Sequence, residues 1–414
     1  PNRFAIDLAT HRYEAYMKHA LLTDKERGTN IALMASGSLH KLDGLYGLKT
    51  YGASEKSAYA QLMFETNISE PHNIAAGLSL SHDYLREETA AGRDYLLEET
   101  SAGRGRSSTS RETTPGAYLQ YTLTAGERLT LMAGLRADHS SRYGYFVTPR
   151  VHIKYMPHDA VTLRLSAGKG YRSPHALAEN NYLLASGRTL VVDELEQEAA
   201  WNYGASAALH IPVANKTLKV NVEYYYTHFL RQTLVDYDSN PQEIRLCNLR
   251  GRSRSHTFQA DATYPLLDGM EVTAAYRLSD VRSAYGGQLM EKPLQSRYKA
   301  LLTVSYKLPP GLWQLDVTFQ QNGGGRLSAQ HGDRAPRQPA RFPAYPQLNA
   351  QLTRWFRHFS VYAGGENLTN YSQPAPILGA DDPWSERFEP TMVWGPVHGI
   401  TFYAGIRVNL GKRM

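Results

Sequence analysis

The stretch Leu129-Thr-Leu-Met-Ala-Gly-Leu-Arg-Ala-Asp138 decides the fold class, because apolar residues occupy every second position. Successive side chains of a β-strand point to opposite faces, so this stretch predicts a strand with one apolar and one polar face. The same alternation recurs at 117–124, 218–227, 298–306 and 400–410. Strands of this length exceed the soluble mode of about five or six residues and match the roughly nine to eleven that cross a bilayer at a tilt.

Composition excludes several classes of protein. Of 414 residues, 20% are charged and 42% are hydrophobic, which argues against disorder. No apolar run approaches the ~18 residues that a membrane-spanning helix needs. The single cysteine, Cys247, excludes a disulfide framework and a cysteine-based zinc site. The net charge of +6 is mild and comes without a basic run, so we expect no nucleic-acid partner.

The connections between the alternating stretches differ in length on the two sides of the predicted sheet. Short turn signals join some pairs of strands directly, at 125–126, 157–159, 267–269 and 309–311. Long polar loops join the others, at about 86–113, 172–193, 232–250, 284–296, 323–343 and 369–397. This asymmetry is typical of an outer-membrane β-barrel, which has short periplasmic turns and long extracellular loops. A large β-sandwich is the alternative.

The pattern predicts one antiparallel β-meander of about 17 strands. Their expected ranges are 2–21, 29–46, 53–69, 72–88, 114–125, 128–142, 144–156, 160–171, 194–211, 216–231, 252–266, 269–283, 296–308, 312–323, 344–356, 358–366 and 398–410. Single-chain bacterial barrels have an even number of strands, so a 22-stranded parent would lack five here. We therefore expect an open, C-shaped wall that is part of a longer polypeptide. A closed ring would favour a small self-sufficient pore.

Alternation also predicts which side chains face lipid. The expected lipid-facing residues are Leu129, Leu131, Leu135, Leu218, Val220, Val222, Leu302, Val304 and Ile406. Those expected to face inward are Arg136, Arg164, Asp261 and Lys299. Because the period is two, a register error of one residue would exchange the two faces of a strand.

Several motifs carry a family resemblance over about 166–414. Segment 166–188, which begins Ser-Ala-Gly-Lys-Gly-Tyr-Arg-Ser-Pro, resembles the mid-barrel motif of TonB-dependent outer-membrane receptors, where a strand rises into a turn and a short helical stretch. Leu195–Glu198 and Trp201–Gly204 look like the returning strand. Gly365-Glu-Asn-Leu-Thr-Asn-Tyr371 is similar to a signature near the C-terminal end of this family. Residues 392–396 and 402–407 resemble the last loop and the closing strand.

The resemblance implies a receptor barrel, spanning 1–414, in the bacterial outer membrane and surrounded by its lipid. It implies a plug domain upstream, moved by the TonB–ExbB–ExbD energy complex. The residues themselves show no catalytic constellation and no metal-ligand spacing, so we expect no enzyme activity, cofactor or resident metal. The leading ligand class is iron–siderophore or haem, and cobalamin or an oligosaccharide is the alternative. A passive porin or an adhesin barrel also stays open. A barrel enzyme is a third option, against which the absence of a Ser/His/Asp-type constellation counts.

The candidate ligand contacts lie in the mid-barrel motif and in two long loops. Loop 323–343 has four arginines against Asp333, a net +3 with histidine neutral, whereas loop 369–397 has four acids against Arg387, a net −3. Receptors for anionic iron chelates would favour arginine-rich mouths, which these loops provide only in part. The candidates are Arg172, His175, Asn181, Tyr182, Arg188, Arg326, His331, Arg334 and Trp384.

Overall fold

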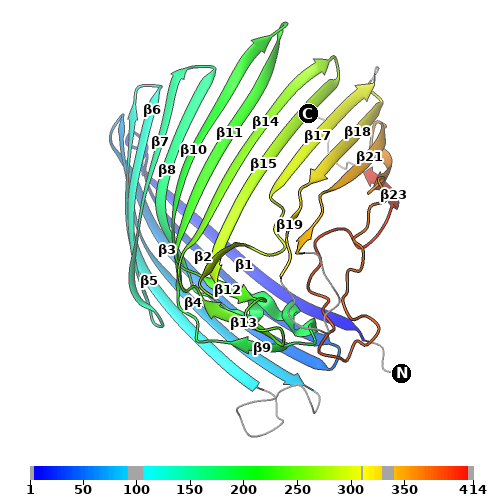
Figure 1. Ribbon diagram of the computed structural model, residues 1–414. Coiled ribbons are helices and arrows are strands. Elements are labelled where there is room, and N and C mark those ends of the chain that lie inside the picture. Colours follow the sequence, from blue (N-terminus) through cyan, green and yellow to red (C-terminus); the bar gives the residue numbers. More distant parts are fainter. Residues whose placement is uncertain (1–3, 92–105, 309–310, 329–339, 409–414) are drawn as a thin grey trace.

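One large antiparallel sheet forms the wall of the protein (Figure 1). The computed structural model describes residues 4–91, 106–308, 311–328 and 340–408. The sheet has eighteen strands, of which β16 (Gln288–Glu291) is a short flap beside β15. The other seventeen are β1 (Ile6–Asp24), β2 (Thr29–Tyr46), β3 (Lys49–Ser69), β4 (His72–Ala91), β5 (Arg106–Ala125), β6 (Leu129–Ser140), β7 (Gly144–His158), β8 (Val161–Arg172), β10 (Glu198–Val213), β11 (Lys216–Arg231), β14 (Ser253–Leu267), β15 (Met270–Tyr285), β17 (Tyr298–Leu308), β18 (Trp313–Asn322), β21 (Tyr345–Trp355), β22 (Phe359–Glu366) and β23 (Thr401–Val408).

These seventeen wall strands confirm the predicted meander, with most boundaries within a few residues. One expected loop is wrong in extent: β4 and β5 continue to Ala91 and from Arg106, well into the range 86–113. Paired strands supply each other's backbone hydrogen bonds, which extends a hairpin even where its residues are polar. At the opposite end the turns are tight. Ala214 and Asn215 both have positive φ, 43° and 64°, the pattern of the type I′ turn that matches strand twist.

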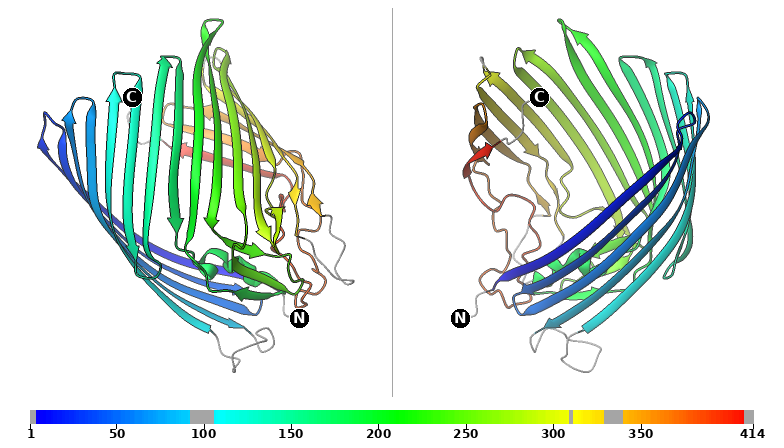
Figure 2. Two further views of the ribbon diagram at one scale, coloured as in Figure 1. Left: turned by 60° about the vertical axis from the view of Figure 1, so that its left-hand side comes forward. Right: turned by 180° about the vertical axis from the view of Figure 1, so that it is seen from behind.

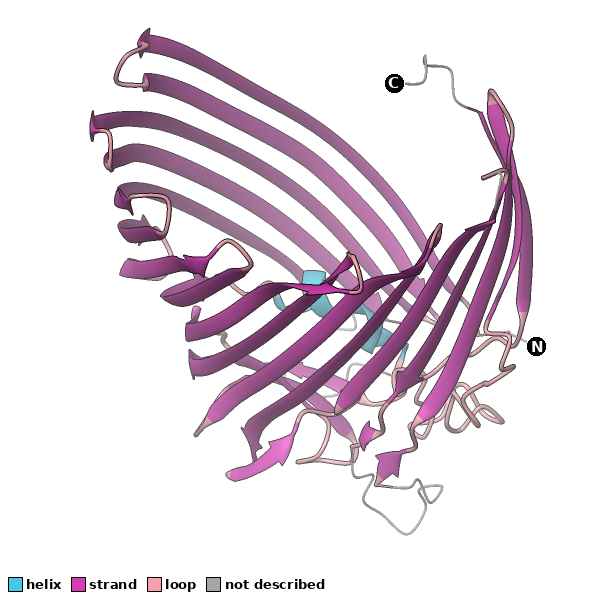
Figure 3. Cartoon of the chain, turned by 90° about the horizontal axis from the view of Figure 1, so that it is seen from above, coloured by secondary structure: helices cyan, strands magenta, loops and turns pink. Residues whose placement is uncertain are grey.

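The register confirms that apolar and polar residues lie on separate faces. Paired residues share a face, and one apolar row runs through Leu131, Ile153, Leu165, Ala205 and Tyr224. Following the pairs around the sheet puts all nine expected lipid-facing residues on this face and the four expected inward residues on the other. The inner face is the concave one, around the helical segment seen in Figure 3.

The wall is open, as the strand count predicted. Within the described residues, β1 pairs only with β2 and β23 only with β22, and no pairing joins β1 to β23. Seen from above, the sheet is therefore C-shaped rather than a closed ring (Figure 3). Nearly every residue of β1 is exposed, and one of its edges has no neighbouring strand within the described residues.

The long connections carry secondary structure that the sequence patterns did not predict. Between β8 and β10 lie α1 (Ala176–Asn180), η1 (Asn181–Ala185) and β9 (Thr189–Val192), of which only a short helical stretch was expected from the family resemblance. Later loops form β12 (Thr233–Asp236), β13 (Glu243–Asn248), β19 (Gly325–Arg326) and β20 (Arg341–Phe342).

Pairing between strands that follow each other in the sequence therefore holds for the wall but not for the long connections. Strand β13 pairs with β12 and, in parallel, with the distant β9, so a separate three-stranded sheet forms at the loops. Its strands have only four to six residues, too short for an alternation pattern to stand out in the sequence. No helix among the described residues is long and apolar enough to cross a membrane.

Candidate functional site

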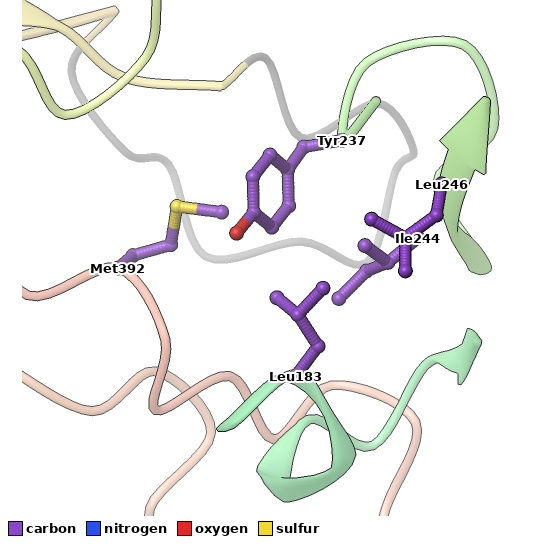
Figure 4. Close-up of a cluster of buried hydrophobic side chains, with 5 residues drawn as sticks. All are labelled: Leu183, Tyr237, Ile244, Leu246 and Met392. Carbon is purple, nitrogen blue, oxygen red and sulfur yellow. The ribbon is translucent and has the colours of Figure 1, made fainter. Parts of the chain in front are cut away.

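The long loops gather at one end of the wall and fold against its concave face. Figure 2 shows this end near the N-terminus, with the tight turns at the opposite end. We call residues 173–197, 232–252 and 367–400 the loop cluster. Five buried side chains from all three segments meet in its core: Leu183, Tyr237, Ile244, Leu246 and Met392 (Figure 4). Since these residues are distant in sequence, their packing fixes the loops relative to one another.

A second core attaches the loop cluster to the wall. Tyr46, the last residue of β2, and Tyr51, near the start of β3, pack against Leu184 and Ala185 of η1. The hydroxyl of Tyr46 donates to Oδ1 of Asn181 at 2.6 Å. The predicted ligand residue Asn181 therefore makes a contact between η1 and the wall.

A buried ion pair joins two loops of the cluster. Nε of Arg188 lies 3.1 Å from Oε2 of Glu389, and the two side chains are 4% and 1% exposed. The hydroxyl of Ser186 donates to the same oxygen at 2.9 Å, and Thr391 donates to Oε1 through its hydroxyl and its backbone N–H. Arg188 also donates to the carbonyl of Tyr237 at 3.1 Å. The predicted ligand residue Arg188 is thus enclosed within the loop cluster.

A second cation lies at the same junction. Nζ of Lys49 donates to the carbonyl of Ser186 at 2.7 Å. Burial lowers the pKa of Lys49 to about 8, although the nearby carboxylate of Glu389 acts in the opposite direction. Lys49 lies outside the membrane-spanning part of β3, since eight residues lie between it and Ala58, where the apolar row of this strand begins.

Two further predicted arginines are held by acidic neighbours. Arg172, at the end of β8, donates to Glu179 and Glu198 at 2.5 Å each, and its side chain is 53% exposed. Arg326 donates to Asp238 at 2.8 Å and to the carbonyl of Glu291 at 2.6 Å. Both guanidinium groups hold loops in place, while Arg172 also stays accessible to solvent.

A cavity of about 420 Å³ lies between the loop cluster and the inner faces of β4 and β5. We call it the mouth cavity. Its polar lining comes from the wall and the adjoining β6–β7 turn (Glu87, Ser108, Thr109, Ser110, Arg142, Tyr143) and from the loop cluster (His175, Asp193, Glu194). The hydroxyl of Tyr143 is buried and has no hydrogen-bond partner in the described part of the chain. Burial also raises the pKa of Tyr143, which lies in the β6–β7 turn.

The structure brings only some of the predicted residues to this cavity. His175 lines it, and Arg172 lies two residues before Pro174, which also lines it. Tyr182 lies in η1 and is 45% exposed. Trp384 lies apart from the mouth cavity, with its ring centroid 5.8 Å from that of Phe4. His331 and Arg334 fall outside the described residues.

Sequence reasoning missed Tyr143, Glu87 and Glu389. Tyr143 and Glu87 belong to strand ends and turns, and their convergence depends on how the wall curves. Glu389 was counted only as one charge of an acidic loop, and nothing in the spacing linked it to Arg188. Within the described ranges, no group of three or more His, Cys, Asp or Glu side chains is arranged to hold a metal ion.

Comparison with known proteins agrees with this architecture. A family model described as "TonB dependent receptor-like, beta-barrel" matches residues 14–368. The copper transporter OprC superposes with a TM-score of 0.69 at 14% identity, covering 95% of this chain and 64% of that protein. The ferric citrate transporter FecA gives 0.67 at 13%, with coverages of 96% and 61%. FpvA of P. aeruginosa, bound to pyoverdine and iron, gives 0.66 at 13%, with coverages of 95% and 55%.

At these identities the solved structures establish the fold alone. The chain spans between 55% and 64% of the length of these three proteins. A search of curated proteins finds no match. The family model, however, covers most of the chain and extends into the N-terminal half, where no motif had been recognised. The chain therefore belongs to the TonB-dependent receptors, a family of outer-membrane β-barrel receptors and transporters rather than enzymes.

Proposed function

We propose that this chain is the barrel wall of a receptor that imports iron as a siderophore complex or as haem. The observation that carries the proposal is the mouth cavity, where polar groups of the wall and of the loop cluster converge. Its volume falls in the range of about 300–1,000 Å³ that is usual for small-molecule sites. In this proposal the ligand touches rigid strands on one side and loops on the other.

The chemistry of the lining supports an oxygen-rich ligand. Arg142 and His175 can donate hydrogen bonds to carboxylate or phenolate oxygens of an iron chelate, and the unpartnered hydroxyl of Tyr143 is available as a further donor. The carboxylates of Glu87, Asp193 and Glu194 suit hydroxyl and ammonium groups of the same ligand. Arg172 and Tyr182 would extend the contact surface, since both are substantially exposed nearby.

The descriptions of two of the three structural relatives name an iron chelate. FecA is a ferric citrate transporter, and FpvA is bound to pyoverdine with iron. OprC is a copper transporter, so the fold itself accommodates different cargoes. Cobalamin, an oligosaccharide and passive diffusion are the alternatives that the binding experiment below separates.

Import requires parts beyond the wall. We propose that the remaining strands and a plug domain belong to the same polypeptide, and that the plug is moved by the TonB–ExbB–ExbD complex. The unpaired edges of β1 and β23 support this, because an unsatisfied backbone group in lipid costs several kcal/mol. Reading the gene upstream of the codon for Pro1 tests it directly: an in-frame plug and five strands are expected, and a stop codon there would refute it.

The ligand class is tested by tryptophan fluorescence titration of the full-length receptor. Ferric siderophores and haemin are compared with cyanocobalamin and maltooligosaccharides. We expect saturable binding of one iron compound, weakened about 2- to 10-fold by Tyr143→Phe, in line with the loss of one hydrogen bond. Tyr145→Phe is the matched control, because Tyr145 lies two residues away and is 87% exposed.

Three outcomes would contradict the proposal. Binding of cyanocobalamin or of the oligosaccharide in place of the iron compounds would change the ligand class. Equal affinity of the wild type and of the Tyr143→Phe and His175→Ala variants would show that the ligand does not bind in the mouth cavity. Entry of unrelated solutes into proteoliposomes at the same rate as the ligand would favour the porin alternative.

A further inference from the structure

A group of two cations and one tyrosine lies on the convex face of the wall, away from the mouth cavity. Lys56 of β3 pairs with Tyr84 of β4, which in turn pairs with Arg111 of β5. Nζ of Lys56 lies 5.9 Å and Cζ of Arg111 5.4 Å from the centroid of the Tyr84 ring. We call these three residues the convex triad. Two positive charges are thus held about one aromatic ring.

The register places the convex triad at the edge of the apolar belt. Next to Lys56 on the same face of β3 come Ala58, Ala60, Leu62 and Phe64, towards the tight turns. On β4 the same face carries Ile74, Ala76, Leu78 and Leu80, which pair with these residues or lie beside them. Tyr84 follows Ile74 by ten residues, about the length of strand that crosses a bilayer. The convex triad therefore lies at the membrane surface on the side of the long loops.

The two cations of the convex triad lack acidic partners. Within the described part of the chain, neither Lys56 nor Arg111 forms an ion pair. Other cations on the same face do: Lys41 lies 2.9 Å from Asp43, and Arg86 lies 2.6 Å from Glu88. Both Lys56 and Arg111 are exposed. A pair of uncompensated charges directly above an apolar surface is complementary to an anionic group attached to an acyl chain.

We propose that the convex triad binds the phosphate of a phosphorylated lipid headgroup in the outward-facing leaflet. Arg111 would engage the phosphate through its planar guanidinium, and Lys56 would contribute a compact second charge. The ring of Tyr84 keeps the two cations apart and sits at the interface, where tyrosine is favoured. The acyl chains would lie on the belt directly below, on Leu80 and Leu78, which are 48% and 62% exposed.

The proposal is tested with the full-length receptor in nanodiscs. The probe is a fluorescent bisphosphorylated lipid A, titrated into phosphatidylcholine discs that carry the receptor. We expect Lys56→Gln combined with Arg111→Gln to raise the dissociation constant about tenfold or more, because two charge-assisted contacts are lost. Lys41→Gln combined with Arg86→Gln removes the same charge from the same face and should raise it less than threefold. Both variants should show wild-type thermal unfolding and wild-type binding of the imported ligand.

The same experiment can overturn the proposal. Equal weakening by the two double variants would mean general attraction of an anionic lipid to a basic surface, without a site. Equal affinity for lipid A from which both phosphates have been removed would exclude the phosphate as the recognised group. Competition by millimolar inorganic phosphate as effective as that by lipid A would assign the convex triad to a soluble anion instead of a lipid headgroup.

Discussion

The wall and the loop cluster differ in where their apolar side chains lie. On the wall, large apolar side chains such as Leu135 and Leu302 are 54% and 43% exposed, on the convex face for which we predict contact with lipid. In the loop cluster, Ile244 and Leu246 are completely buried, as in the core of a small soluble domain. The wall is held by a continuous register of backbone hydrogen bonds, whereas the loop cluster is held by packing between distant segments.

The effect of a substitution therefore depends on the region in which it lies. A polar change on the convex face alters transfer into lipid and leaves the loops in place. A change in the loop cluster leaves the hydrogen bonds of the wall intact and releases only the loops, so it opens a local unit rather than the whole protein.

The largest effect is expected for Glu389→Gln in the loop cluster. Removing one partner of a buried ion pair leaves the guanidinium of Arg188 uncompensated, which costs about 3–5 kcal/mol. Hydrogen exchange should show lost protection in 181–192 and 376–395 and unchanged protection in β6, β7 and β8. Glu386→Gln is the matched control, because this exposed acid lies in the same loop. Equal loss of protection in the wall would refute the separation of the two regions.

The next effect concerns the wall. Ala133→Arg puts a charge in the middle of the apolar row of β6, where an arginine facing lipid costs about 2–4 kcal/mol. Met132→Arg puts the same charge on the inner face and should cost little. Refolding of the full-length receptor into lipid vesicles, followed in urea, measures both. Similar destabilisation by the two variants would contradict the assignment of faces.

The pH dependence of the loop cluster depends on Lys49. Its folded-state pKa of about 8 lies below the ordinary 10.5, so between these values the unfolded cluster binds more protons. Stability must therefore rise with pH from about 8 to 10.5, by about 1–3 kcal/mol, and be lowest below 8. Exchange rates of amides in 181–192, corrected for intrinsic pH dependence, should show this rise, and Lys49→Met should remove it. A rise that persists in Lys49→Met would assign the titration to another group.

The smallest effect is expected for Arg172→Gln. Its two ion pairs, with Glu179 and Glu198, involve a half-exposed guanidinium, and such pairs contribute only about 0–1 kcal/mol. Global unfolding should therefore be unchanged within error. A loss above about 2 kcal/mol would show that Arg172 holds the helical segment more strongly than its exposure allows.

Sequence reasoning succeeded where structure is periodic. Leu129, Leu131 and Leu135 could be assigned to one face because a strand repeats every two residues. The open edge followed from the strand count, and the short helix after Pro174 from a resemblance. Sequence reasoning failed where segments that are distant in sequence meet. The parallel pairing of β9 with β13 and the contact of Arg188 with Glu389 have no local signal, because neither spacing nor alternation encodes them.

We predict that one face of the wall contacts lipid and that the other contacts the loop cluster and water. Nitroxide labels placed singly at positions 131–137 of the full-length receptor test it, through their accessibility to oxygen and to a water-soluble relaxing agent. We predict high oxygen accessibility at 131, 133, 135 and 137 and high accessibility to the water-soluble agent at 132, 134 and 136. Uniform accessibility along the strand, or the opposite alternation, would contradict this assignment of the two faces.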